Sequence, residues 1–267
     1  MTRLKTALTI AGSDSGGGAG IQADLKTFTA FGVYGMTVIT SVTAQNTLGV
    51  LDIHDLPAAF VARQLEAVLS DLPVDAAKTG MLSTAGIIRT VGAQLRERNI
   101  KNLVVDPVMV AKSGHRLLQE EALQALREEL LPAASVLTPN LPEAEVLTGL
   151  KISGPEEMRR AAEMIHALGP ASVLIKGGHL EGRAVDILFD GSEFIELPAD
   201  RVDTRHTHGT GCTLSAAIAA LLAQEQKIAE AVMAAKDFIT RAIQTAPGLG
   251  HGHGPLNHFV KPGTPGR

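Results

Sequence analysis

The sequence predicts an α/β fold with a central, mostly parallel sheet. Short runs of β-branched residues alternate with longer helical patterns, which is typical of βαβ units. Several of these runs end in polar or glycine-rich clusters, as strands of an open parallel sheet do where ligands bind. The chain has 267 residues, and no linker-like tract or repeat divides it. We therefore expect a single domain over residues 1–267.

The β-branched runs predict six strands, at 7–10, 37–42, 75–79, 103–106, 135–138 and 172–176. Apolar residues at helical spacing predict helices at 20–32, 57–70, 84–98, 117–130, 142–149, 155–168, 211–224 and 227–245. Segments 184–189 and 193–197 are joined by Asp190, Gly191 and Ser192, which predicts a β-hairpin outside the βαβ rhythm. The end, KPGTPGR, is expected to be a frayed tail.

Composition excludes several classes of function. The formal net charge is −4 with acidic and basic residues mixed along the chain, so no nucleic-acid partner and no polybasic membrane anchor is expected. The absence of Trp and the single Tyr also disfavour stacking on single-stranded nucleic acid. One cysteine cannot form an internal disulfide, and neither a signal peptide nor a membrane-spanning run is apparent. A cytoplasmic protein is the simplest interpretation.

Six polar clusters follow predicted strands, and together they are the first functional signal. They are AGSDSGGGAG, TAQN, KTGM, DPVM, TPNLPE and KGGH. Any one of them could be an ordinary turn, because Gly, Asn, Pro and Asp are common in turns. Six at the carboxyl ends of parallel strands would converge on one edge of the sheet, which indicates a ligand site there.

The glycine-rich segment SDSGGGAGIQAD follows a predicted strand and opens a helix, as phosphate loops do. No G-K-[ST] follows it, which excludes a Walker A loop, and Ile21 stands where a Rossmann fingerprint needs its third glycine. What remains is a backbone that a ligand can approach closely. Asp24, about one turn into the helix, is either part of that site or a solvated acid favoured by the helix dipole.

The segment RHTHGTGCTL precedes an alanine-rich helix and predicts an anion-binding turn. The N–H groups of Gly209, Thr210 and Gly211 would be unpaired at the positive end of the helix dipole. Such a turn could stabilise the negative charge of a transferring phosphoryl group. Cys212 would lie on the first turn, where we expect a lowered thiol pKa; the alternative is a small buried helix residue.

These residues carry a resemblance to a known family. The chain resembles the ribokinase-like superfamily and, within it, the hydroxymethylpyrimidine and phosphomethylpyrimidine kinases of thiamin synthesis, which are related to pyridoxal kinases. The matching motifs are AGSDSGGGAGIQADLKTF, TSVTAQNTLGV, AAKTGML, VVDPVM, LTPNLPEAEVLTG, LIKGGH, THGTGCTLSAA and GHGHGPLNH. They occur in the family's order along most of the chain, which makes the resemblance specific.

The resemblance implies a three-layer α/β/α sandwich and an enzyme that moves the γ-phosphoryl group of ATP, with Mg²⁺, to a hydroxymethylpyrimidine and then to its monophosphate. It also implies a homodimer formed through the edge of the fold. A pyridoxal kinase, an enzyme with both activities, and a non-catalytic pyrimidine-binding protein remain alternatives. A pure binder would need the pocket but not the phosphate-handling residues.

The resemblance also implies roles for individual residues. Gln45 would read the pyrimidine, in a pocket lined by Gly12, Gly18, Ala19, Asp24, Met81 and Val108. The nucleotide and its metal would be held by Asn140, Glu143, Lys176 and Gly211, with Asp106 and Glu143 as the metal-organising carboxylates. Catalysis would fall to Lys176, Gly209, Thr210, Gly211 and Cys212. The bland alternatives are a turn residue at 45, core residues at 81 and 108, a surface lysine at 176, and a helix cap formed by Asn140 with Glu143.

The chain departs from the superfamily pattern at two places in the late motif. Cys212 stands where most sugar kinases of the superfamily carry an aspartate base, so either the thiol or the phosphates would accept the hydroxyl proton. His206 stands where this branch usually has asparagine. We expect His208 and His179 to lie in loops around the phosphates. His251, His253 and His258 are expected in a surface or dimer-edge loop rather than at a metal.

Overall fold

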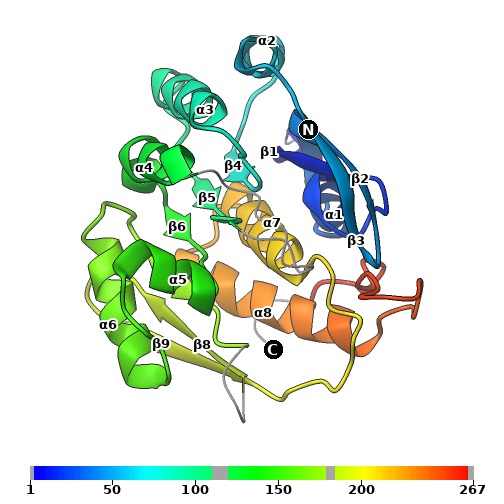
Figure 1. Cartoon of the computed structure of the whole chain (residues 1–267), viewed down its shortest axis with the longest axis vertical. Helices are drawn as coiled ribbons and strands as arrows, with labels where there is room; N and C mark the ends of the chain where they lie inside the picture. Colours follow the sequence, from blue (N-terminus) through cyan, green and yellow to red (C-terminus); the bar gives the residue numbers. More distant parts are fainter. Residues whose placement is uncertain (1–2, 110–119, 179–183, 264–267) are drawn as a thin grey trace.

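The computed structural model describes residues 3–109, 120–178 and 184–263, whose nine strands form one sheet (Figure 1). Their order is β3-β2-β1-β4-β5-β6-β7-β8-β9. The parallel strands are β1 (Thr6–Asp14), β2 (Tyr34–Asn46), β4 (Ala76–Thr79), β5 (Leu103–Val105), β6 (Val136–Leu137) and β7 (Val173–Ile175). Antiparallel strands extend both edges: β3 (Gly49–Asp55) beside β2, and the hairpin β8 (Ala184–Phe189) and β9 (Phe194–Ala199) beside β7.

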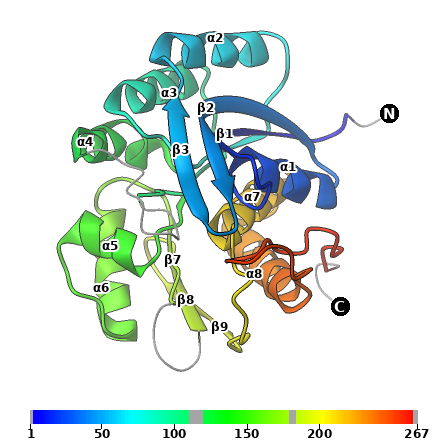
Figure 2. The ribbon, with the colours of Figure 1, turned by 45° about the vertical axis from the view of Figure 1, so that its right-hand side comes forward.

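Helices cover both faces of the sheet and complete the predicted three layers (Figure 2). One face carries α2 (Ala58–Leu69), α3 (Ala85–Glu97), α4 (Glu120–Glu129), α5 (Leu141–Thr148) and α6 (Pro155–His166), with a 3₁₀ turn, η1 (Leu131–Ala133). The other carries α1 (Gly20–Ala30), α7 (Thr210–Ala223) and α8 (Ile228–Gln244). Because strand side chains alternate between faces, Ala7 packs in one core and Leu8 in the other.

Helix α7 is the most deeply packed helix of the second layer. Every residue from Thr213 to Ala223 is buried, and five of these eleven residues are alanine, so the helix can approach the sheet and α8 closely. It contacts β1, β4 and β5 as well as α1 and α8. The chain leaves β1 toward β2 and returns to β4 on the opposite side, so β1 and β4 flank the switch point where ligands bind in such sheets. The packing of α7 sets its first turn near that point.

The predicted fold is confirmed, but one strand was missed, and two strands, β1 and β2, are longer than predicted. Strand β3 was not predicted, because as an edge strand its residues are half-buried or exposed and lack a buried alternating face. Strand β2 runs on to Asn46, so the TAQN cluster is the end of a strand rather than the loop after it. Residues 117–119 of the fourth predicted helix and 264–267 of the predicted tail lie outside the described residues.

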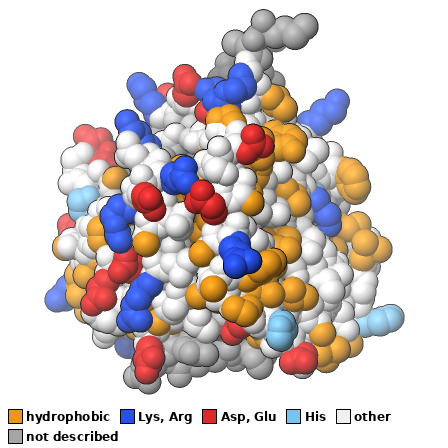
Figure 3. Space-filling model, turned by 90° about the horizontal axis from the view of Figure 1, so that it is seen from above, with side chains coloured by type: hydrophobic (Ala, Val, Ile, Leu, Met, Phe, Trp, Pro, Cys, Tyr) orange, Lys and Arg blue, Asp and Glu red, His pale blue; other side chains and the backbone are white. Residues whose placement is uncertain are grey.

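Exposed apolar side chains gather at the β2–β3 edge of the sheet. Val42, Leu48 and Leu51 are 46%, 68% and 77% exposed. On the face in Figure 3, basic and acidic side chains are interspersed, while hydrophobic ones concentrate on the right-hand side. In the described part of the chain, no helix has the length and apolar character to cross a bilayer.

Candidate active site

Gly209 joins the start of α7 to the glycine-rich loop after β1. Its φ of 81° lies in the left-handed region, which glycine adopts without strain. A Cβ at this position would lie 1.8 Å from the carbonyl oxygen of Gly18, so any side chain would force the two loops apart. The carbonyl oxygen of Gly209 accepts the N–H of Thr213 at 2.9 Å, which begins the helix.

The first turn of α7 presents unpaired backbone donors. The hydroxyl of Thr210 donates to the carbonyl oxygen of Thr207 at 2.7 Å. Within the described residues, the N–H groups of Gly211 and Cys212 have no hydrogen-bond acceptor. Two free donors at a positive helix end are suited to an anion. The sequence predicted free N–H groups on Gly209, Thr210 and Gly211, but the N–H of Thr210 donates to the carbonyl oxygen of Thr207 at 3.4 Å, and that of Cys212 is free instead. The use of this turn for phosphate stays a prediction.

Lys176 and Asp106 form an ion pair beside this turn. Lys176 follows β7 and Asp106 follows β5, and their Nζ and Oδ1 atoms are 3.1 Å apart. The aspartate side chain is 2% exposed, whereas that of the lysine is 15% exposed. A Cβ built on Gly211 would lie 3.4 Å from Lys176 Nζ, so the ammonium lies next to the free N–H groups. These residues, from three separate predicted motifs, are brought together.

Asn140 and Glu143 form a complete capping box at the start of α5. The Asn140 side chain accepts the N–H of Glu143, and Glu143 Oε2 accepts the N–H of Asn140. This is the structural alternative that the sequence left open, and it is confirmed. Burial raises the pKa of Glu143 to about 7, with the Asp106 carboxylate adding to the rise and the Lys176 ammonium opposing it. Glu143 therefore combines a capping contact with a place in the charged cluster.

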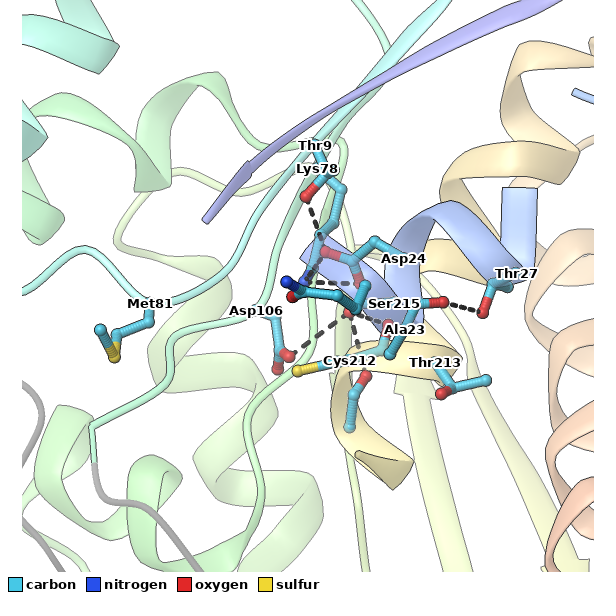
Figure 4. A network of polar contacts seen from close by, with 12 residues as sticks. Thr9, Ala23, Asp24, Thr27, Lys78, Met81, Asp106, Cys212, Thr213 and Ser215 are labelled. Carbon is cyan, nitrogen blue, oxygen red and sulfur yellow. Dashed lines mark hydrogen bonds and ion pairs between the residues drawn. The ribbon is translucent and has the colours of Figure 1, made fainter. Parts of the chain in front are cut away.

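A second lysine–aspartate pair lies beneath the site, and the sequence did not predict it (Figure 4). Lys78 of β4 donates to both oxygens of Asp24, at 3.1 and 2.9 Å, and the Thr9 hydroxyl donates to Asp24 Oδ2 at 2.6 Å. Both charged side chains are 0% exposed. Burial opposes the charge on Lys78, but the Asp24 carboxylate outweighs it and raises the pKa of the lysine.

The location of Asp24 corrects one sequence-based expectation. We expected this side chain to line the substrate pocket or to be a solvated acid of the first helical turn. It is instead fully enclosed, with its oxygens engaged by Lys78 and Thr9. An ammonium buried in an otherwise apolar strand requires a carboxylate partner, and the register of α1 against β1 and β4 supplies it. The fully buried Lys78 in AAKTGML was the overlooked signal.

The pKa of Cys212 also differs from the expectation. The residue lies on the first turn of α7, as predicted, and is partly exposed as a whole while its sulfur is enclosed. Burial of the sulfur raises the pKa of the thiol to about 11, and the carboxylates of Asp24 and Asp106 act in the same direction. The ammonium of Lys78 and the N–H of Gly20 oppose the rise without cancelling it. The expected lowering by the helix terminus is therefore wrong for this thiol.

Gln45 lies at the end of β2, half-buried beside the glycine-rich loop. Its Oε1 is 3.1 Å from the Thr43 hydroxyl, and its Nε2 is 3.4 Å from Nε2 of His208. Its backbone N–H and carbonyl oxygen both pair with the Ser15 hydroxyl at 2.8 Å. The amide is thus held at the junction of β2, the glycine-rich loop and the segment before α7.

The other predicted pocket residues line the same region. Gly12 is buried, and a Cβ there would lie 2.9 Å from Cε of Met81, which covers it. Met81 and Val108 are partly exposed after β4 and β5. Gly18 is buried and Ala19 partly exposed in the loop that leads into α1. The sequence located these residues at one edge of the sheet, and their substrate contacts stay predictions.

Asp14, at the end of β1, was not singled out by the sequence. Its carboxylate accepts N–H groups from Gly16, Gly18 and Ala19 at 2.8 to 2.9 Å, and it lies 2.8 Å from Nε2 of His208. An aspartate followed by several glycines favours a carboxylate that accepts N–H groups from its own loop. That local signal was available, but the partner 194 residues away was not.

Of the other histidines that the sequence singled out, four lie before α7 or after α8 in the described residues. His206 is half-buried against Gly254, and His253 Nδ1 is 3.0 Å from the carbonyl oxygen of Arg205. His251 is exposed in the same loop. His258 Nε2 is 2.9 Å from the Thr213 hydroxyl, and its burial lowers its pKa to about 4. His179 lies outside the described residues.

Comparison with known proteins gives consistent matches along the chain. Residues 14–257 match the family model described as phosphomethylpyrimidine kinase. A hydroxymethylpyrimidine/phosphomethylpyrimidine kinase of Rhizobium meliloti is 57% identical over 95% of this chain and 96% of its own length. The thiamine biosynthesis bifunctional protein ThiED of Geobacter sulfurreducens is 56% identical, and the match spans about half of that longer protein (52%). A solved ADP complex of Bacillus subtilis pyridoxal kinase superposes with a TM-score of 0.90 at 45% identity, covering 96% of this chain and 98% of that one.

Proposed function

Because the chain belongs to the phosphomethylpyrimidine kinase family, we propose that it transfers the γ-phosphoryl group of ATP to 4-amino-5-hydroxymethyl-2-methylpyrimidine and then to the resulting monophosphate, in thiamin biosynthesis. The observation that carries the proposal is the pair of free N–H groups on the first turn of α7 beside the Lys176 ammonium. A transferring phosphoryl group gathers negative charge on its oxygens, and fixed donors with a cation are what stabilise it.

The proposed first step joins the hydroxymethyl oxygen of the pyrimidine to the γ-phosphorus of ATP. The bond from that phosphorus to the bridging oxygen breaks, and ADP leaves with the electron pair. The N–H groups of Gly211 and Cys212 and the Nζ of Lys176 surround the moving phosphoryl group. Gly209 and Thr210 fix the turn that aims those N–H groups. In the second step, an oxygen of the monophosphate is the acceptor in the same geometry.

The hydroxyl proton has two possible destinations, and the thiol pKa favours the phosphates. With its pKa raised to about 11, the Cys212 thiol stays protonated at neutral pH. In a loose transition state the proton leaves late, when the phosphoryl oxygens already carry charge. We therefore propose that an oxygen of the transferred group takes the proton. Cys212 is still proposed to act in catalysis, because its backbone N–H would donate to the transferring phosphoryl group and its side chain would lie against that group.

The residues around Lys176 suit Mg²⁺ bound together with ATP. Asp106 and Glu143 are two buried carboxylates that share one ammonium, so the cluster has room for more positive charge. Among the described residues no group of three His, Cys, Asp or Glu side chains forms a cage. Mg²⁺ fits such a site because it keeps waters and takes few protein ligands. Asp106 and Glu143 would hold it, Asn140 would hold Glu143, and the ion would neutralise charge on the ATP phosphates.

On the pyrimidine side, Gln45 is proposed to pair with the edge of the heterocycle. A primary amide offers a donor and an acceptor, which matches the amino group and ring nitrogen of an aminopyrimidine. Met81 and Val108 would contact the flat faces of the ring, and Gly12, Gly18 and Ala19 would let the backbone approach it. We expect Gln45→Leu to raise KM for the pyrimidine with a smaller effect on kcat.

A phosphate-transfer assay tests this function. ADP release and product mass are measured with the hydroxymethylpyrimidine, its monophosphate and pyridoxal, side by side, with Lys176→Met as the control. We expect turnover of both pyrimidines. Turnover of pyridoxal alone would make the chain a pyridoxal kinase, an alternative favoured by its 45% identity to the Bacillus subtilis enzyme. Tight pyrimidine binding without ADP release would make it a binding protein.

We also propose that residues 1–267 act as one kinase domain in a homodimer in the cytoplasm. One sheet joins all the described strands, which supports the single domain. The exposed Val42, Leu48 and Leu51 at the sheet edge support a contact between copies. The use of ATP supports the cytoplasmic location. Sedimentation of the wild-type chain and of Leu51→Lys would test the dimer: a wild-type monomer would refute it.

A further inference from the structure

The Asp14 carboxylate lies where the glycine-rich loop after β1 meets the segment before α7, and it accepts several hydrogen bonds there. Its Oδ1 accepts the N–H of Gly16, and its Oδ2 accepts those of Gly18 and Ala19. The side chain is 2% exposed. Burial works against its charge, but hydrogen bonds from His208 and from the backbone outweigh burial and lower the pKa of Asp14. Asp14 is therefore an anion with no proton to donate, and it lies 2.8 Å from Nε2 of His208.

That anion fixes the tautomer of His208. Since Asp14 can only accept, His208 Nε2 carries a proton and donates it to Oδ2. The ring also packs closely against the glycine-rich loop, because a Cβ on Gly18 would be 2.5 Å from His208 Cδ2. The backbone N–H of His208 donates to the carbonyl oxygen of Gly254 at 3.1 Å. The imidazole is thus held by Asp14 and by the packing against Gly18, and its backbone is held by Gly254.

The fixed tautomer leaves the Gln45 amide free for a ligand. Nε2 of Gln45 is 3.4 Å from Nε2 of His208, which has no lone pair to offer once it carries a proton. The Gln45 oxygen is 3.1 Å from the Thr43 hydroxyl, which also donates to the carbonyl oxygen of Ser13 at 2.7 Å. With Nε2 of His208 protonated, the NH₂ group of Gln45 has no protein acceptor among the described residues. An NH₂ group facing the site would donate to a ring nitrogen of an aminopyrimidine.

His208 also stands next to Gly209, the residue whose carbonyl starts α7. The same imidazole therefore contacts the residue proposed to read the heterocycle and borders the turn proposed to hold the phosphoryl group. A shift of about 1 Å between the two parts would misalign the acceptor oxygen and the γ-phosphorus. The hydrogen bonds of Asp14 with Gly18 and His208 connect the two parts and would resist that shift.

We propose that Asp14 and His208 are positioning residues, which together keep the Gln45 NH₂ group available to the heterocycle and in register with the first turn of α7. This inference rests on the proposed function, because it assumes that Gln45 binds the pyrimidine. Neither residue transfers a proton to substrate. Each acts through Gln45 and the loop that carries Gly18.

The test is a double-mutant cycle between His208 and Gln45 in the full-length chain. His208→Phe keeps the ring but removes the donor, and we expect it to raise KM for the pyrimidine at least about tenfold, with KM for ATP changed less than about threefold. In a Gln45→Leu background the same change should alter KM by less than about threefold, because the amide it positions is gone. Multiplicative effects in the double variant would overturn the proposal.

Three further variants keep the test decisive. His208→Gln places an amide donor near the position of Nε2, and we expect it to restore KM to within about threefold of wild type. If His208→Phe does not fold, Asp14→Asn takes its place in the cycle, because it keeps the size of the side chain while releasing the His208 tautomer. His253→Gln changes another histidine of the neighbouring loop and should leave all constants unchanged. Failure of the wild type to phosphorylate the pyrimidine would refute the proposed function instead, which separates the two failures.

Discussion

Two lysine–aspartate pairs flank the start of α7, and they differ in their access to solvent. Lys78 and Asp24 are both 0% exposed, and the lysine bonds to both carboxylate oxygens. Lys176 is 15% exposed and makes one contact with Asp106, at 3.1 Å. The first pair is closed, while the second keeps donors free and has Glu143 as an extra acid beside it.

The Lys78–Asp24 pair therefore stabilises the fold, whereas the charge of Lys176 is available to a ligand. A buried lysine whose donors are committed to one carboxylate cannot turn toward a phosphate without leaving a buried anion behind. A partly exposed lysine with one partner can share its protons with an incoming anion. The same two residue types therefore serve different purposes because of where the sheet places them.

Breaking the closed pair should have the largest effect. We expect Lys78→Met to lower the free energy of unfolding by about 3–5 kcal/mol, because it leaves the Asp24 carboxylate buried without a cation. Denaturant unfolding followed by circular dichroism measures this. The double variant Lys78→Met/Asp24→Leu removes both charges and should recover most of the loss. Equal instability of the single and double variants would contradict the assignment of the loss to an unpaired charge.

Breaking the open pair should instead reduce turnover. We expect Lys176→Met to lower kcat about 10²–10³-fold while the free energy of unfolding changes by less than about 1 kcal/mol. Steady-state kinetics with ATP and the pyrimidine give kcat, and the same denaturant experiment gives stability. Lys151→Met, on a side chain that is 94% exposed, is the matched control and should change neither. An unchanged kcat for Lys176→Met would remove the lysine from the mechanism.

The sequence singled out both residues of the open pair, though not their contact, and missed Lys78 of the closed pair, for a physical reason. Asp106 and Lys176 follow strands inside polar clusters, DPVM and KGGH, and such clusters are visible one at a time. Lys78 lies within a strand, and its partner lies on a helix 54 residues earlier. Nothing local in AAKT specifies that partner. The lysine could have been recognised as unusual, but the carboxylate follows only from the packing of α1 against the sheet.

The same division holds for Cys212 and Gly209. The glycine before α7 was predictable because a left-handed turn with free N–H groups is a local property of the backbone. The thiol pKa was not predictable, because it depends on burial and on Asp24 and Asp106, which come from distant parts of the chain. Regular elements were predictable where one face is buried, and the half-exposed β3 was not.

Cys212 lies between the two pairs, so its titration reports on both. Each pair is neutral as a whole, and neither offsets the burial that raises the thiol pKa to about 11. The rate of iodoacetamide alkylation should therefore rise with pH beyond the ordinary thiol value of 9.0. The single cysteine makes the readout unambiguous. A plateau in the rate below about pH 8 would mean that the thiolate is stabilised instead.

The kinetic counterpart is Cys212→Ser. If the phosphates accept the proton, this variant should stay folded and lose less than about tenfold in kcat, because its backbone N–H remains in place. A loss beyond about 10²-fold would assign the proton to the sulfur. A wild-type rate would make the thiol purely structural.

Removing the one hydroxyl that contacts the aspartate of each pair should have the smallest effect and gives the most closely matched comparison of the two pairs. Thr9 donates to Asp24 at 2.6 Å, and Ser215 lies 3.4 Å from Asp106, with both residues 0% exposed. Thr9→Val should lower the free energy of unfolding by about 1.5–3 kcal/mol with kcat unchanged, because a buried carboxylate loses a short hydrogen bond.

Ser215→Ala should lower the free energy of unfolding by less than about 1 kcal/mol, because its bond to Asp106 is long and its hydroxyl is also 3.0 Å from the carbonyl oxygens of Gly211 and Cys212. We expect a kcat reduction of up to about threefold for this variant alone, since Asp106 positions Lys176. A fall in kcat for Thr9→Val of the same size would show that the closed pair also acts on the reacting groups, and the distinction between the pairs would fail.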